Sequence, residues 1–126
     1  MPFTLHKNER LTSRTLIEQL FRGNGTKAVN AFPLRAVYAT TERHADDAPM
    51  QMMASVSKRH FKRAVKRNRV KRQIREAYRL NKSLLPTPPD GQQLIVAFIW
   101  LADTLYPSTV VHEKMVKAMK RIKDER

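Results

Sequence analysis

One segment constrains the fold of this chain more than any other, because it combines an extreme positive charge with a regular apolar stripe. Between Lys58 and Lys82 there are twelve Lys or Arg residues and one acid, Glu76, which gives a net charge of +11. At the roughly 100° per residue of an α-helix, one face carries Val70, Ile74, Ala77 and Tyr78. The spacing therefore predicts a helix over 62–81 that packs this stripe on a core and exposes its charges.

The polar side of the predicted helix indicates a nucleic-acid partner. Solvated helix faces usually pair Glu with Lys, whereas this one is nearly free of acid, so its like charges repel until an anion binds. Arginine matches phosphate oxygens with a planar fork, and Asn68 has a donor and an acceptor that can read a base edge or a ribose hydroxyl. The whole chain has a net charge of +14 and a pI near 10.8, which is the electrostatic footprint of such proteins. Charge alone does not choose RNA over DNA.

The charges of the helix are not equivalent in position. Opposite the apolar stripe lie Asn68, Arg72, Arg75 and Arg79, with Arg69 and Lys71 on the flanks. Nearer the buried side, at the N-terminal end, the sequence places Arg63, Lys66 and Arg67. These three either reach solvent with their long stems or line a cleft beside the sheet.

Apolar periodicity elsewhere predicts two more helices and three or four strands. We expect helices over 11–22 and from Pro107 onward, and strands over 31–40, 50–57 and 94–101, with a short extra strand at 27–29. Thr12 or Ser13 should cap the first helix and Gly23 should end it. In the first long strand one face should carry Phe32, Leu34, Ala36 and Tyr38. This order predicts an α+β fold with helices on one sheet, in a single domain over 1–126.

The chain offers little from which a protein active site could be built. It has no cysteine, three glycines and dispersed carboxylates, and its histidines are scattered as His6, His44, His60 and His112. Residues 1–10 lack the apolar region of a secretory signal, and the longest apolar run, 94–102, is far shorter than the roughly 20 residues of a membrane span. We therefore expect a cytoplasmic protein with no catalytic or metal-binding residues and no membrane partner.

The basic segment and the residues before it resemble the signature of the bacterial ribonuclease P protein family. That family has a Ser-Val-Ser-Lys-Lys-like strand end, matched here by 55–59, and then an Arg-Asn-Arg helix, matched by Arg67, Asn68 and Arg69. The match continues through 75–78. It extends more weakly over nearly the whole chain, including Arg10, Leu11, Phe21 and Phe32.

The resemblance implies both a fold and a function. The fold is an α/β sandwich like the second domain of ribosomal protein S5, with helices on a mainly antiparallel sheet of about four strands, the order αβββαβα and a left-handed βαβ crossover through the basic helix. The function is that of the protein subunit of ribonuclease P. In that ribonucleoprotein the RNA subunit hydrolyses precursor tRNA and releases its 5′ leader, with magnesium ions held mainly by the RNA. The implied partners are ribonuclease P RNA and precursor tRNA, and no protein oligomer is required.

The resemblance also assigns two groups of site residues. The first group contacts the catalytic RNA and consists of Arg67, Asn68, Arg69, Lys71, Arg72 and Arg75. The second group lines a cleft between the basic helix and the sheet, and this cleft holds the single-stranded leader. The second group consists of Phe21, Phe32, Ser57, Lys58 and Arg63. Core packing is the alternative role for the two aromatics, and Ser57 could simply end a strand. Ile17 and Arg35 stand where the family often has aromatic residues. Arg35 can replace the aromatic side chain either through its charge or by stacking its guanidinium on a base.

Three other functions are alternatives on the residues alone. A binding module such as a ribosomal protein would share the charge but not the long motif. A protein-only nuclease would need clustered carboxylates for its metal ions. A basic amphipathic helix at a membrane surface would favour Trp or Phe at interface positions, which the predicted helix lacks.

Overall fold

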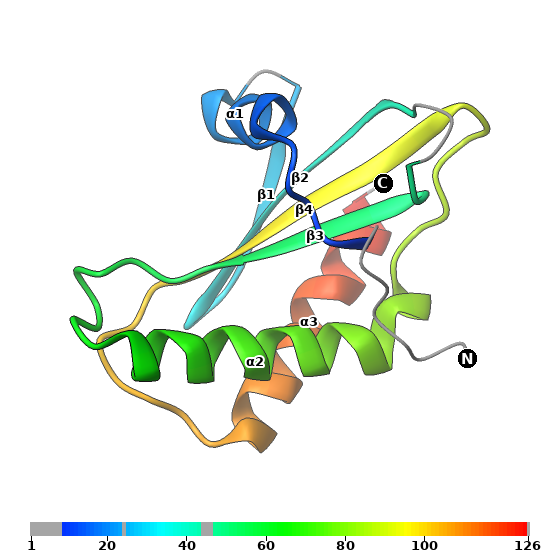
Figure 1. Cartoon of the computed structure of the whole chain (residues 1–126). Helices are drawn as coiled ribbons and strands as arrows, with labels where there is room; N and C mark the ends of the chain where they lie inside the picture. Colours follow the sequence, from blue (N-terminus) through cyan, green and yellow to red (C-terminus); the bar gives the residue numbers. More distant parts are fainter. Residues whose placement is uncertain (1–8, 24, 44–46, 126) are drawn as a thin grey trace.

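The computed structural model describes residues 9–23, 25–43 and 47–125. The elements follow one another as α1 (Arg14–Arg22), β1 (Lys27–Ala31), β2 (Leu34–Glu42), β3 (Met50–Ser55), α2 (Ala64–Asn81), the short 3₁₀ turn η2 (Lys82–Leu84), β4 (Gln92–Trp100) and α3 (Ser108–Glu125) (Figure 1). The α+β class and the order αβββαβα expected from the sequence are confirmed.

Four strands form one mixed sheet in the order β1-β2-β4-β3. β2 is antiparallel to both of its neighbours, whereas β3 and β4 are parallel and are connected through α2. The crossover that the resemblance implies is therefore present, and its left hand stays a prediction. β4 lies inside the sheet, and its residues from Leu94 to Phe98 are at most 2% exposed, as expected of a continuous apolar run.

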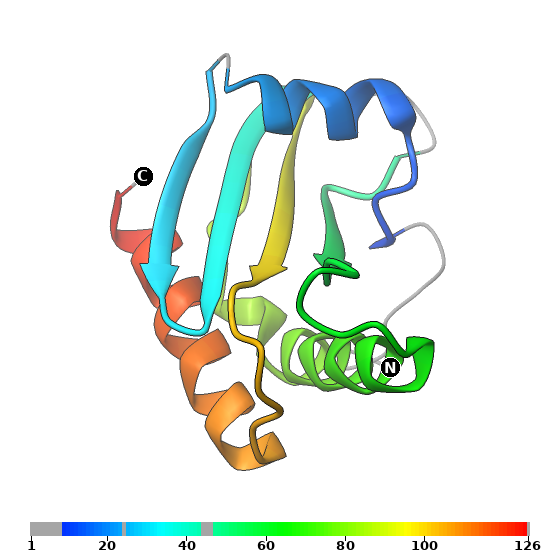
Figure 2. The same cartoon turned by 90° about the vertical axis from the view of Figure 1, so that its left-hand side faces the viewer.

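The helices cover opposite faces of this sheet. α2 and α3 pack on one face, where alternate residues of β4 such as Val96 and Phe98 join the buried stripes of both helices in the main core. In α3 the repeat expected from the sequence, Val111, Met115, Met119 and Ile122, is completely buried. α1 packs on the other face and crosses only one end of the strands (Figure 2). The second face is therefore covered by a helix at one end alone.

The first hairpin differs from the sequence prediction. The short strand expected at 27–29 is confirmed and is longer, as β1, but the strand expected over 31–40 begins only at Leu34. Phe32 and Pro33 form the two-residue turn between β1 and β2, and the peptide bond that joins them is cis. Proline has no N–H for a ladder hydrogen bond, so it interrupts the apolar run. Phe32 therefore does not share a strand face with Leu34, and its side chain is 60% exposed.

The start of the first helix also differs, because the preceding chain is used for strand pairing. The N–H of Leu11 donates to the carbonyl of Met52 at 2.7 Å, and Arg10 forms a parallel β-bridge with Met52. This keeps residues 10–11 extended beside β3, and α1 begins at Arg14. Ser13 is the N-cap, with its hydroxyl accepting from the N–H of Leu16 at 3.4 Å, and Gly23 ends the helix in a left-handed conformation.

Candidate RNA interface

α2 is amphipathic in the way its spacing predicted. Its apolar stripe is at most 2% exposed and consists of Val70, Ile74, Ala77 and Tyr78. On its other sides Asn68, Arg69 and Arg72 are exposed, and Lys71 and Arg75 are half-buried. The helix thus holds its cations at the surface because its apolar side is fixed in the core.

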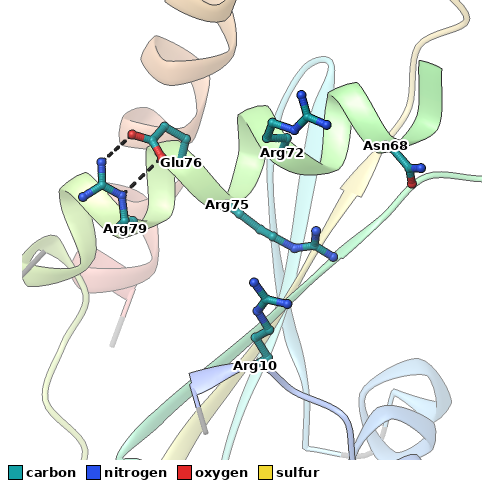
Figure 3. A pocket seen from close by; sticks show the side chains of 6 residues that line it. All are labelled: Arg10, Asn68, Arg72, Arg75, Glu76 and Arg79. Atoms are coloured by element: carbon teal, nitrogen blue, oxygen red, sulfur yellow. Dashed lines mark hydrogen bonds and ion pairs between the residues drawn. The ribbon is translucent and has the colours of Figure 1, made fainter. Parts of the chain in front are cut away.

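An open depression of about 450 Å³ lies along this exposed side (Figure 3). Five of its lining residues come from α2, and the sixth, Arg10, comes from the segment before α1: the set is Arg10, Asn68, Arg72, Arg75, Glu76 and Arg79. Glu76 accepts hydrogen bonds from Arg79 at 2.5 and 3.2 Å, and this interaction holds the pKa of the Glu76 carboxyl below its usual value. The single carboxylate of the lining is therefore committed to Arg79, and the depression is strongly cationic.

Arg67 has a local partner that the sequence did not reveal. Its Nη1 donates to the backbone carbonyls of Phe61 and Lys62, both at 2.8 Å, which ties the loop before α2 to the first turn of the helix. A guanidinium carries five N–H donors, and Nη1 supplies two of them, so three remain for another ligand. Arg67 thus fixes the loop and still presents donors to the surface.

The loop from β3 to α2 is held by further hydrogen bonds. The carbonyl of Ser57 accepts from His60 and Phe61, and its hydroxyl accepts from the N–H of Arg59 at 3.1 Å. Nδ1 of His60 lies 2.5 Å from a carboxylate oxygen of Asp103. The strand expected over 50–57 therefore ends at Ser55, and Ser57 shapes a turn rather than merely terminating a strand. Lys58, which follows, is exposed in that turn.

In the part of the chain that the structure describes, the five residues expected to bind the leader do not line a single cleft between the basic helix and the sheet. α2 sits directly on the sheet through its buried stripe, and Phe21 belongs to α1 on the opposite face. A hollow of about 270 Å³ does lie between α2 and the edge of β3, but its lining includes Arg10, Thr12 and Arg75 and none of the five. The resemblance implied a cleft without showing which face of the sheet each helix covers, and the binding of the leader by these five residues stays a prediction.

The five residues instead fall into two places. Phe21 is exposed on α1, which crosses one end of the sheet, whereas Phe32 is exposed in the turn between β1 and β2 at the other end (Figure 2). Ser57, Lys58 and Arg63 lie in the loop that leads from β3 to α2, with Arg63 at the N-cap of the helix. This loop is at the end of the sheet where β3 and β4 finish, which is also the end where Phe32 lies, because Leu34 pairs with Trp100 at the end of β4.

On the open part of the sheet face, a row of polar and apolar side chains crosses all four strands, and sequence reasoning missed it. Strand register aligns Asn30, Arg35, Ile99 and Ser55 across β1, β2, β4 and β3. Nη1 of Arg35 donates to the side-chain oxygen of Asn30 at 3.2 Å, which holds the guanidinium along the row. Asn30 and Ile99 could have been found only with the strand order in hand.

Metal ligands and membrane spans were searched in the described part of the chain. There, no three His, Cys, Asp or Glu side chains gather to hold a metal ion, and His6, His44 and Asp46 lie outside the described residues. None of the described helices has the length and apolar character needed to cross a bilayer.

Comparison with known proteins decides the family. The family model described as Ribonuclease P matches residues 5–123. This chain belongs to the ribonuclease P protein family. The ribonuclease P protein component of Porphyromonas gingivalis is 45% identical over 122 residues, which cover 95% of this chain and 87% of that protein. The ribonuclease P protein component of Chlorobaculum tepidum is 30% identical over 106 residues, 78% of this chain and 68% of that one. The solved RNase P protein from Thermotoga maritima has the same fold, with a TM-score of 0.69, 22% identity and coverage of 90% and 97% of the two chains.

The family assignment decides between the functions that the residues alone left open. The chain is the protein component of ribonuclease P, the endoribonuclease that matures the 5′ end of tRNA. In this ribonucleoprotein the RNA subunit is the catalyst and its reaction depends on metal ions. The partners of the ribonuclease P protein are accordingly ribonuclease P RNA and precursor tRNA.

Proposed function

We propose that this protein holds its two RNAs on two different surfaces. The exposed side of α2 binds the catalytic RNA, and the part of the sheet face that α1 leaves open binds the 5′ leader of precursor tRNA. The observation that carries the proposal is the charge of α2: its one acid, Glu76, is paired with Arg79, so the other cations along the depression lack a carboxylate from the helix itself.

The first surface uses the residues that match the Arg-Asn-Arg motif and its continuation. Exposed arginines bind phosphates bidentately, and the Asn68 amide discriminates a base edge or a ribose hydroxyl because it both donates and accepts. Arg67 contributes through the three N–H groups that its backbone contacts leave unused. The complete set for the catalytic RNA is Arg67, Asn68, Arg69, Lys71, Arg72 and Arg75.

The second surface combines stacking with charge. Phe21 is 52% exposed and Phe32 is 60% exposed, which favours stacking on bases over the alternative of core packing, since aromatics that serve a core are buried. Arg35 lies on the same open face and replaces an aromatic through its guanidinium. Ile17 is half-buried against the core beneath α1, so it offers no comparable platform. Leader phosphates are bound at the edge of this surface by Ser57, Lys58 and Arg63.

Magnesium is proposed to be the metal of the reaction and to be held mainly by the RNA. Magnesium takes oxygen ligands in octahedral geometry, chiefly carboxylates, phosphates and water. The depression beside α2 offers four guanidinium groups, one amide and one carboxylate that is paired with Arg79, so it does not fit the ion. The role of this chain is thus to place RNA, acting as one RNA-binding domain over residues 1–126 in the cytoplasm.

The two-surface proposal can be tested with two variants, each of which is the control for the other. Arg72→Ala should weaken binding to ribonuclease P RNA while leaving the preference for leader-bearing over mature tRNA intact. Phe32→Ala should bind ribonuclease P RNA normally, but the assembled enzyme should bind leader-bearing tRNA about 1–3 kcal/mol more weakly, the usual range for one stacked base. Both side chains are exposed, so neither change should unfold the protein. The proposal fails if Phe32→Ala weakens leader-bearing and mature tRNA equally, or if Arg72→Ala leaves the affinity for ribonuclease P RNA unchanged.

A further inference from the structure

The segment before α1 is anchored beside the basic helix at two points. On one side of Arg10, Leu11 donates its N–H to the carbonyl of Met52 at 2.7 Å. On the other side, both carboxylate oxygens of Glu9 accept from Nζ of Lys82, at 2.9 and 3.0 Å. Both side chains of this ion pair are mostly shielded from solvent, 18% and 15% exposed. The backbone at Arg10 is therefore fixed between β3 and the end of α2.

This anchoring brings two like charges face to face. Arg10 and Arg75 extend toward each other across the depression (Figure 3), and both line it. The pKa of Arg75 is lowered, mainly by partial burial and to a smaller extent by the nearby charge of Arg10. In the part of the chain that the structure describes, neither guanidinium has an ion pair or a side-chain hydrogen bond, because Glu9 is bound to Lys82 and Glu76 to Arg79.

Two guanidinium groups held together without an acid repel each other and so destabilise the free protein. A phosphodiester placed between them would remove this repulsion and accept hydrogen bonds from both planar forks. A protein anion could do the same, but the two carboxylates nearest in the sequence, Glu9 and Glu76, are already used. The arrangement therefore suits a ligand that arrives from outside with its own negative charge.

We propose that Arg10 and Arg75 clamp one phosphate of the catalytic RNA, so that Arg10, which lies outside the basic helix, is an RNA-binding residue. This inference rests on the proposed role of α2 and extends its surface to a second segment of the chain. Asn68 and Arg72 line the same depression, so the strand that carries the clamped phosphate passes along α2. The clamp exists only in the folded protein, because 65 positions separate its two arginines in the sequence.

A salt titration of a double-mutant cycle tests this proposal. Binding to ribonuclease P RNA is measured for the wild type, Arg10→Ala, Arg75→Ala and the double variant, with Lys120→Ala on α3 as a control for the loss of one exposed charge. Each single arginine variant should weaken binding by about tenfold or more, as expected of a charge-assisted contact. It should also reduce the slope of log affinity against log salt by about one unit, the value for one phosphate. Because one phosphate is shared, the double variant should resemble the single ones.

Three results would overturn the clamp. One is Arg10→Ala binding no more weakly than Lys120→Ala, and another is a double variant whose losses multiply and whose slope falls by about two units, which would mean two separate phosphates. Arg72→Ala, measured in parallel, separates the hypotheses: if it weakens binding while Arg10→Ala does not, the interface on α2 stands and only the clamp fails.

The third result comes from Arg10→Glu, which would place a carboxylate opposite Arg75. The melting temperature of this variant should rise while its affinity for RNA falls, since the repulsion is replaced by an ion pair that occupies the site. Binding at the wild-type affinity by the folded variant would contradict the clamp.

Discussion

Replacing Ile74 with alanine tests whether burial of the apolar stripe is what presents the charges of α2. Ile74 is fully buried between α2 and the sheet. The change removes three carbon groups at about 0.8 kcal/mol each, and incomplete collapse of the cavity adds to this. We therefore expect a loss of about 3–4 kcal/mol, within the range of about 2–5 kcal/mol for such truncations. Ile74→Asp should cost more, because a carboxylate would be buried without a partner.

The matched control is Arg72→Ala, two residues away on the exposed side. Its side chain contacts solvent, so its truncation should change the free energy of unfolding by about 0.5 kcal/mol or less. Urea denaturation of RNA-free protein measures both effects, and the m-value shows whether the unfolded state is unchanged. If Arg72→Ala unfolds the protein while Ile74→Asp folds normally, the two faces of the helix have been assigned the wrong way round.

Two further predictions follow from the charge and from the family. Across a series of salt concentrations, the affinity of the wild-type protein for ribonuclease P RNA should fall linearly on logarithmic axes, by up to about one unit of slope for each phosphate bound; a slope near zero would remove the electrostatic argument. Rigorously RNA-free protein should not cleave precursor tRNA in the presence of magnesium, and it should stimulate cleavage by added ribonuclease P RNA at low magnesium; metal-dependent cleavage by the protein alone would contradict an RNA-borne catalyst.

The sequence by itself determined the features that depend on local periodicity. A helix repeats every 3.6 residues, so Val70, Ile74, Ala77 and Tyr78 had to share a face once the segment was helical. The continuous apolar run of β4 predicted a strand buried on both faces for the same kind of reason. The charge of the basic segment and the Arg-Asn-Arg motif then indicated the partner and the family. None of these conclusions required knowledge of which elements are neighbours.

The tertiary structure decided everything that depends on how distant segments meet. Only the strand order β1-β2-β4-β3 aligns Arg35 with Ile99 and Ser55, and only the packing of α1 and α2 on opposite faces separates Phe21 from the basic helix. The juxtaposition of Arg10 and Arg75 likewise requires residues 10–11 to pair with β3. The physical reason is that a periodic pattern fixes which side of an element is buried, whereas the partner that buries it is chosen by the packing of the whole chain.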